Sequence, residues 1–285
     1  MPNPDSTPVV GSALARLKQH ASAWKVDIDA VVHAPVSLVA YGMRDGTPVV
    51  LKVIKDPGDE WWSGEVANAF AGRGMARVYE YAGGALLLER LRPGQPLTRL
   101  ATTESDDEAT GILARLVSTM SPEPAPRHVP RVEQWVEGFD RYAQSGDRGI
   151  PSGMVADARD VFVDLAASQR GIRLLHGDLQ HTNVLYDEER GWMAIDPKGV
   201  VGEPEYELGA MLRNPADRPG LFTDQATIAR RVDRLTSELR LDRQRIVGWG
   251  FAQAVLSAIW DFEDGGAIGS DHPAIALARE LRAMA

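Results

Sequence analysis

The chain has 285 residues, of which 31 are basic and 40 are acidic, so its formal net charge is −9. An acidic chain of this kind argues against a nucleic-acid-binding protein, which normally presents a basic surface. The sequence contains no cysteine, which excludes disulfides, thiolate zinc sites, iron–sulfur clusters and cysteine nucleophiles. The first ten residues lack a secretion signal, and no apolar run approaches the roughly 18 residues that span a membrane. We therefore expect a cytoplasmic protein that binds neither nucleic acid nor membrane.

The first third of the chain is rich in predicted strands. Asp45-Gly46 and Gly83-Gly84 predict tight turns within two hairpins. A helix that begins near Asp59 is predicted between these hairpins, because apolar residues recur there at helical spacing. Short apolar and β-branched runs predict strands at 26–33, 38–41, 47–54, 76–81 and 85–91.

After Pro93 the hydrophobic pattern becomes helical, and we divide the chain there into a smaller lobe, 1–92, and a larger helical lobe, 93–285. Ser105 and the three acids after it predict a capped helix start. The arginines near position 231 are expected on a solvated face. Further apolar stripes predict helices around 132–139, 155–165 and 246–262.

One segment, 174–202, interrupts the helices with short strands and loops of the kind that carry chemistry. Asn183 follows Asp178 by five positions, and a predicted hairpin would return Asp196 beside Asn183. Amide and carboxylate oxygens are hard ligands, suited to a magnesium ion that bridges nucleotide phosphates. Asp178 would then be free to accept a hydroxyl proton and to orient that oxygen for attack on a terminal phosphate.

The strand-rich part supplies a cation for such phosphates. Lys52 lies among apolar residues of the 47–54 strand, where an unpaired charge is costly to bury. We expect a carboxylate partner, and Glu65 in the following helix is the candidate. A strand lysine, a helix glutamate and then an Asp, Asn, Asp series is the order of catalytic parts in protein kinases.

These motifs resemble the aminoglycoside phosphotransferases, and most closely the branch of streptomycin 6-phosphotransferases and hydroxyurea kinases. The resemblance extends over nearly the whole chain. It implies an α+β, protein-kinase-like fold of two lobes and an ATP- and magnesium-dependent transfer of phosphate to a hydroxyl group. Streptomycin-type aminoglycosides are the first acceptor class, hydroxyurea the second and a host metabolite the third. The segments that carry it are 87–91, His176-Gly177-Asp178-Leu179, 195–204, Leu212-Arg213-Asn214-Pro215 and 252–258.

Carried over residue by residue, the resemblance makes Asp178 the catalytic aspartate and assigns Asn183 and Asp196 to magnesium. Lys52 would hold the α- and β-phosphates, steadied by Glu65.

Adenine would meet the backbone of a hinge that runs from Glu89 to Leu91. The chain has no glycine-rich phosphate loop, and Ser37, which stands in its place, is a candidate phosphate contact. Glu207 stands where relatives commonly carry Asp, and it is expected to brace a loop.

Cationic groups on an acceptor call for carboxylates. The candidates are Asp261, Glu263 and Asp264 near the end of the late helix, together with Glu203 and Glu205 after the magnesium loop. Lys198 could touch a phosphate during transfer or pair with a nearby acid.

Two functions other than that of a kinase are compatible with parts of the sequence. A metal-dependent hydrolase could use His176, Asp178 and His181, but the chain offers no second Asp/His ligand cluster, and this reading leaves Lys52 and Glu65 unexplained. A catalytically weak nucleotide-binding module is disfavoured, because every expected catalytic position is filled.

Overall fold

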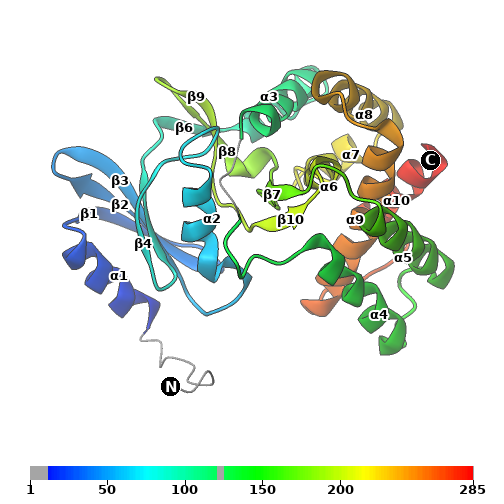
Figure 1. Cartoon of the computed structure of the whole chain (residues 1–285), viewed down its shortest axis with the longest axis horizontal. Coiled ribbons are helices and arrows are strands. Elements are labelled where there is room, and N and C mark those ends of the chain that lie inside the picture. Colours follow the sequence, from blue (N-terminus) through cyan, green and yellow to red (C-terminus); the bar gives the residue numbers. More distant parts are fainter. Residues whose placement is uncertain (1–11, 121–124, 285) are drawn as a thin grey trace.

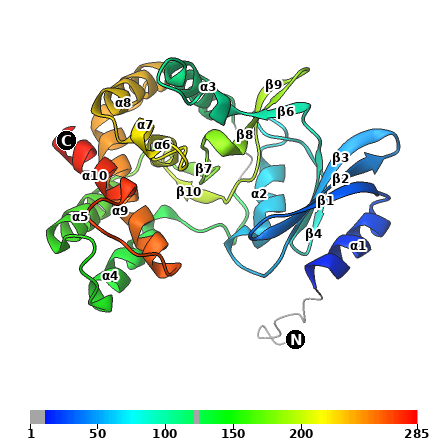
Figure 2. The ribbon, with the colours of Figure 1, turned by 180° about the vertical axis from the view of Figure 1, so that it is seen from behind.

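A computed structural model of the chain describes residues 12–120 and 125–284. Two views from opposite sides show a part built around a twisted sheet and a larger, mainly helical part (Figures 1 and 2). Within the described residues, no helix is both long and apolar enough to cross a membrane.

A five-stranded antiparallel sheet forms the first part, in the order β1-β2-β3-β5-β4. Both predicted hairpins are confirmed. Asp45-Gly46 joins β2 to β3 and Gly83-Gly84 joins β4 to β5, and all four residues have the positive φ that tight hairpin turns require. The strands are β1 (Asp27–His33), β2 (Ser37–Arg44), β3 (Thr47–Ile54), β4 (Val78–Ala82) and β5 (Ala85–Glu89).

Helices flank this sheet on either side in Figure 1. The first, α1 (Ala13–Ala23), was not predicted; it buries Leu17 and Ala21 in the apolar core of the sheet. A short 3₁₀ turn, η1 (Asp59–Trp62), precedes α2 (Ser63–Ala69). Helix α2 shares the hydrophobic core of the larger part through residues such as Val66.

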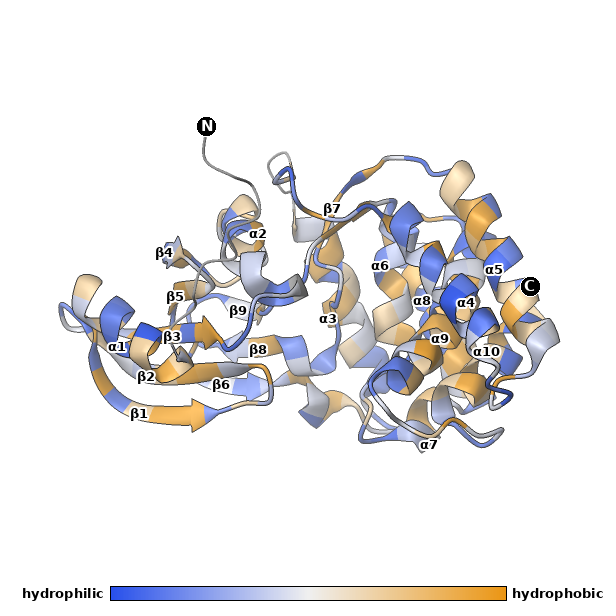
Figure 3. Ribbon diagram, turned by 90° about the horizontal axis from the view of Figure 1, so that it is seen from below, coloured by the Kyte–Doolittle hydropathy of each residue, from blue (hydrophilic) through white to orange (hydrophobic). Residues whose placement is uncertain are grey.

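The larger part is organised around a long helix, α9, which is buried along most of its length between α5, α6 and α10. Figure 3 shows apolar residues recurring along α9. Helices α8 and α10 were not predicted. The elements are β6 (Pro93–Pro96), η2 (Leu97–Leu100), α3 (Asp106–Thr119), η3 (Val132–Trp135), α4 (Val136–Ser145), α5 (Ser152–Ala167), β7 (Arg173–Leu175), η4 (His181–Asn183), β8 (Val184–Asp187), β9 (Gly191–Ala194), β10 (Val200–Gly202), α6 (Pro204–Leu212), α7 (Pro219–Phe222), α8 (Gln225–Leu239), α9 (Arg243–Glu263) and α10 (Pro273–Met284).

The structure corrects two expectations about α3 and α8. Arg231 is not on a solvated face: it is 2% exposed, and its Nη2 lies 2.6 Å from Oδ1 of Asp106. Ser105 does not cap α3, because its hydroxyl donates to the carbonyl of Leu100. Packing decides both outcomes, since the acid at the start of α3 serves as the partner of a buried guanidinium on α8.

Candidate active site

The His176-Gly177-Asp178 motif lies on a loop that follows β7. The side-chain amide of Asn183 donates to the backbone carbonyl of Asp178 at 2.9 Å and to its carboxylate at 3.1 Å. The guanidinium of Arg213 lies 3.9 Å from the other carboxylate oxygen. These contacts orient the Asp178 side chain, which is 18% exposed.

Helix α6 supports this loop through hydrogen bonds to the side chain of Glu207. The buried Glu207 carboxylate accepts hydrogen bonds from the backbone N–H groups of His176 at 2.6 Å, Gly177 at 3.0 Å and Leu179 at 3.4 Å. Burial raises the pKa of Glu207 to about 7, although these hydrogen bonds oppose the rise. The expected brace is therefore confirmed.

The predicted hairpin between Asn183 and Asp196 is also confirmed. Strands β8 and β9 pair in antiparallel register, and Ile195 N–H donates to the Asn183 carbonyl at 2.9 Å. Asp196 has a φ of 62°, an uncommon conformation for a residue with a side chain and one that recurs at functional sites. The hairpin therefore brings the backbone of Asn183 next to the residue that precedes Asp196.

Lys52 on β3 is 5% exposed and forms an ion pair with Asp196. Its second partner is Glu60, whose Oε2 lies 3.3 Å away, and not Glu65 as expected. The carboxylate of Glu65 instead lies 3.5 Å from Nε2 of His128. The cause is the 3₁₀ turn η1, which the sequence did not reveal and which places Glu60 near β3 ahead of α2.

A cavity of about 290 Å³ opens between the sheet and the loops of the larger part. Its wall is mostly apolar, with Lys52 and Asp196 among its few charged groups, which is typical of a ligand pocket. Among the backbone hydrogen bonds of the described residues, none uses the N–H of Leu91. Other lining residues are Val39, Tyr41, Val50, Ala76, Leu88, Glu89, Arg90, Pro93, Gly94, Leu185 and Ile195.

Of the remaining nucleotide-site candidates, Glu89 and Leu91 line this cavity, whereas Ser37 does not. The Glu89 carboxylate is engaged by Arg190 and accepts from the backbone N–H of Arg77 at 2.8 Å, and the Glu89 N–H donates to the Arg77 carbonyl at 3.0 Å, so Glu89 has its backbone carbonyl to offer a ligand. Ser37 is buried at the start of β2, on the strand face that carries Val39 two residues later.

A family model described as aminoglycoside/hydroxyurea antibiotic resistance kinase matches residues 23–265. The chain belongs to this family. It is 33% identical over 256 residues to the streptomycin 6-kinase of Streptomyces griseus, which covers 85% of this chain and 80% of that protein. It is 35% identical over 269 residues to the hydroxyurea phosphotransferase of Kitasatospora aureofaciens, which covers 88% and 73% respectively.

The fold agrees with this assignment. The crystal structure of aminoglycoside phosphotransferase APH(4)-Ia superposes with a TM-score of 0.64 at 15% identity, covering 96% of this chain and 100% of that one. The expected α+β, protein-kinase-like fold is confirmed. As a member of the antibiotic resistance kinase family, the chain is a phosphotransferase with a hydroxyl acceptor, and ATP is its implied phosphate donor.

A second cavity of about 370 Å³ in this kinase adjoins the same loops. Gly177, Lys198 and Gly199 line it from the loops, and Arg213 lines it from the end of α6. Two of the acidic candidates, Glu263 and Asp264, line it from the end of α9. The remaining lining residues are Trp135, Arg141, Val200, Tyr206 and Trp260.

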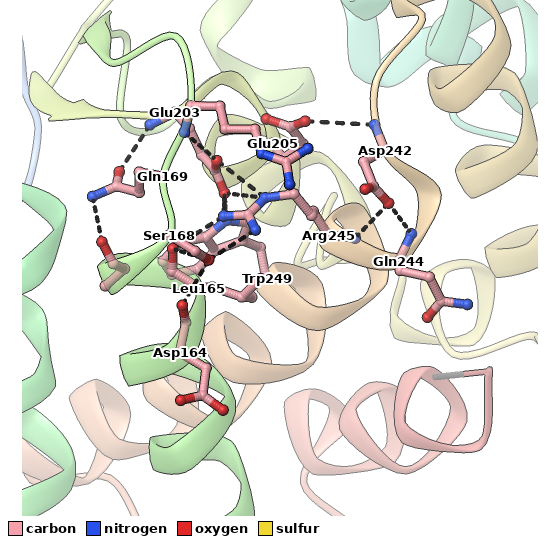
Figure 4. A network of polar contacts seen from close by, with 12 residues as sticks. Asp164, Leu165, Ser168, Gln169, Glu203, Glu205, Asp242, Gln244, Arg245 and Trp249 are labelled. Carbon is pink, nitrogen blue, oxygen red and sulfur yellow. Dashed lines mark hydrogen bonds and ion pairs between the residues drawn. The ribbon is translucent and has the colours of Figure 1, made fainter.

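Three acceptor candidates do not line this cavity, and one of them, Glu205, is buried and accepts from the backbone N–H of Asp242 at 3.5 Å. Glu203 is fully buried and forms an ion pair with Arg245, while the indole N–H of Trp249 donates to the same carboxylate (Figure 4). Its expected role in acceptor recognition is wrong, because it ties the start of α6 to α9 inside the protein. Asp261 lies outside the cavity lining and pairs with His272 at 3.2 Å.

The sequence analysis gave no role to Arg213 and Arg141, which line the second cavity, or to Glu60, which contacts Lys52. Arg213 was quoted as part of a family motif, so a signal existed, but no role was given to it. Glu60 and Arg141 carried no signal, because their partners come from other segments of the chain.

Proposed function

We propose that this kinase transfers the γ-phosphate of ATP to a hydroxyl group of a streptomycin-type aminoglycoside. One observation carries the proposal: the segment from Ile195 to Val200 lines two cavities, and the loop of Asp178 adjoins the second of them. The first cavity contains Lys52 and Asp196, and the second contains Gly177 and Lys198. A donor in the first cavity and an acceptor in the second would meet at Asp178.

ATP would place its adenine against the hinge, where the Leu91 N–H offers a hydrogen bond and Glu89 contributes its backbone. Lys52 would bind the phosphates next to Asp196. Ser37 stays a prediction as a phosphate contact, since it lies on the same strand face but outside the cavity lining.

Magnesium would be held by Asn183 and Asp196. The amide nitrogen of Asn183 is used by Asp178, which leaves its oxygen for a ligand role. The described part of the chain contains no group of three His, Cys, Asp or Glu side chains placed to hold a metal ion, so phosphates and water would supply the other ligands, as is usual for magnesium. The bound ion would offset negative charge on the phosphates.

Asp178 would accept the proton of the acceptor hydroxyl and orient its oxygen. That oxygen then forms a bond to the γ-phosphorus while the bond between this phosphorus and the bridging oxygen of ADP breaks. The hydrogen bond from Asn183 keeps the carboxylate in one orientation. Because ATP is a cytoplasmic reactant, we propose the cytoplasm as the place of action.

The proposal is tested with a panel of acceptors and magnesium-ATP, read by the mass shift of the acceptor. A phosphorylated streptomycin supports it. Hydroxyurea is the second candidate, because a hydroxyurea phosphotransferase is among the relatives. If only hydroxyurea or a cellular metabolite is phosphorylated, that compound and not streptomycin is the acceptor. Binding of ATP without transfer to any acceptor would leave only a catalytically weak nucleotide-binding module.

A further inference from the structure

An ion pair spans the second cavity between α4 and α9. The guanidinium of Arg141 meets the carboxylate of Glu263 with two contacts, Nε to Oε1 at 2.7 Å and Nη2 to Oε2 at 3.3 Å. Both residues line the cavity. Figures 1 and 2 place the end of α9 beside α4, so the pair joins two helices and not neighbours in sequence. A two-contact guanidinium–carboxylate pair is the geometry by which a carboxylate binds any guanidinium group.

Arg141 has an alternative partner on its own helix. Its Nη1 lies 4.0 Å from Oε2 of Glu137, one turn earlier on α4. The Arg141 side chain is 56% exposed and that of Glu263 is 32% exposed. Exposed ion pairs contribute little to stability, typically below about 1 kcal/mol, so an incoming cation can displace Arg141. The released guanidinium would still have Glu137 within reach.

Positive and negative side chains line different sides of this cavity. Lys198 and Arg213 line it from the side of the catalytic loop, whereas Glu263 and Asp264 line it at the end of α9. The C-terminal end of a helix carries partial negative charge, which adds to the attraction for a cation there. Trp135 and Trp260, whose rings pack edge to face with centroids 5.9 Å apart, also line the cavity. An acceptor with its hydroxyl at the loop would therefore place a cationic group at α9.

We infer that Arg141 is a specificity-determining residue that occupies the acceptor's cation site in the empty protein. Glu263 binds the guanidinium of Arg141 when no acceptor is present. A guanidinium-bearing acceptor takes the same carboxylate, and Arg141 turns to Glu137. An uncharged acceptor has no cation to exchange, so the pair stays closed and that acceptor gains nothing from Glu263. The inference rests on the proposed function, because it takes the second cavity as the acceptor site.

The test compares Arg141→Gln, Glu263→Gln and the double variant, with streptomycin as the guanidinium-bearing acceptor and hydroxyurea as the uncharged one. Arg159→Gln is the matched control, since Arg159 pairs with Asp140 at the same 2.7 Å outside the cavity. Calorimetry of streptomycin binding in the presence of ADP supplies a readout that does not depend on turnover.

Arg141→Gln should lower the KM and Kd for streptomycin about two- to fivefold, which is the size of a weak exposed pair. The streptomycin KM should fall relative to the hydroxyurea KM, because only streptomycin carries a cation that competes with Arg141 for Glu263. Glu263→Gln should raise the streptomycin KM about tenfold through loss of a charged hydrogen bond. In that background, Arg141→Gln should add nothing, because Arg141 acts through Glu263.

A streptomycin KM that rises in Arg141→Gln, or that matches the Arg159→Gln control, overturns the inference. Failure of the proposed function looks different. If streptomycin binds with these variant effects but receives no phosphate, the acceptor assignment fails and the cation exchange stands. If the protein phosphorylates hydroxyurea and does not bind streptomycin, the kinase activity stands and the exchange is refuted.

Discussion

At the scale of single residues, the proposed chemistry depends on one carboxylate that two neighbours orient. Asn183 donates to Asp178, and Arg213 lies 3.9 Å from its other oxygen. The proposed nucleotide cavity is lined by other residues, so nucleotide binding and proton acceptance can be separated by mutation.

Asp178→Asn should retain ATP binding and lose transfer by about 10²- to 10⁴-fold, because the acceptor hydroxyl loses its proton acceptor while the phosphate site is unchanged. Turnover with the true acceptor and ATP affinity by calorimetry are the measurements. Asp157→Asn, at an exposed ion pair with Arg282, is the control for the same chemical change. Near wild-type turnover in Asp178→Asn would remove Asp178 from the catalytic role.

The partner of Lys52 is decided by a double-mutant cycle. Lys52→Met should impair transfer by misplacing the phosphates, and Glu60→Gln should couple with it, since Glu60 lies 3.3 Å from the ammonium group. Glu65→Gln should be additive with Lys52→Met, because Glu65 contacts His128 in this structure. Coupling of Lys52 with Glu65, measured on kcat/KM, would show that α2 repositions when nucleotide binds.

At the scale of elements, α6 supports the loop that carries Asp178. The buried side chain of Glu207 accepts hydrogen bonds from three backbone N–H groups, and its pKa is raised to about 7 from an ordinary value of 4.5. A raised pKa means that the folded protein favours the protonated acid. Its stabilising contribution is therefore complete below pH 4.5 and is lost as the pH rises towards 7.

Between pH 4.5 and 7, the free energy of unfolding of the wild type should thus fall by up to about 3 kcal/mol more than that of Glu207→Gln, which cannot titrate. Denaturant unfolding of both proteins between pH 4.5 and 8 measures the difference. Parallel stability curves would mean that Glu207 stays ionised throughout.

The buried ion pair of Asp106 and Arg231 holds helices α3 and α8 together. The guanidinium of Arg231 also donates to the backbone carbonyls of Met211 and Asn214. Asp106→Asn should destabilise the protein by about 3–5 kcal/mol, because it leaves a buried guanidinium without its counter-charge. The neighbouring Asp107→Asn is the control, since Asp107 pairs with Arg234 at the surface and should cost about 1 kcal/mol or less. Equal losses in urea unfolding would contradict this assignment.

At the scale of the whole molecule, the proposed nucleotide cavity is lined by residues from both parts of the chain. ATP should therefore stabilise the protein as a unit, by about 2.7 kcal/mol at a concentration one hundred times its Kd. Magnesium should add to the shift in Tm, and Asp196→Ala should abolish that added shift because a proposed ligand is gone. A magnesium-dependent shift that persists in Asp196→Ala would place the ion elsewhere. The lobe boundary at residues 92 and 93 stays a prediction.

Features that depend on short stretches of sequence could be predicted. The turn at Asp45-Gly46 needs only two residues that accept positive φ, and the approach of Asp196 to Asn183 needs only one hairpin. The spacing of Asp178 and Asn183 likewise lies within one loop. Such features depend on neighbours along the chain, and the sequence states those neighbours directly.

Partners from distant segments were decided only by the tertiary structure. Glu203 and Asp261 looked like acceptor carboxylates, yet packing gives one to Arg245 and the other to His272. Glu60, and not Glu65, reaches Lys52 because an unforeseen 3₁₀ turn precedes α2. A buried charge needs a counter-charge nearby, and the packing of the helices decides which residue supplies it. The local sequence pattern does not specify that packing.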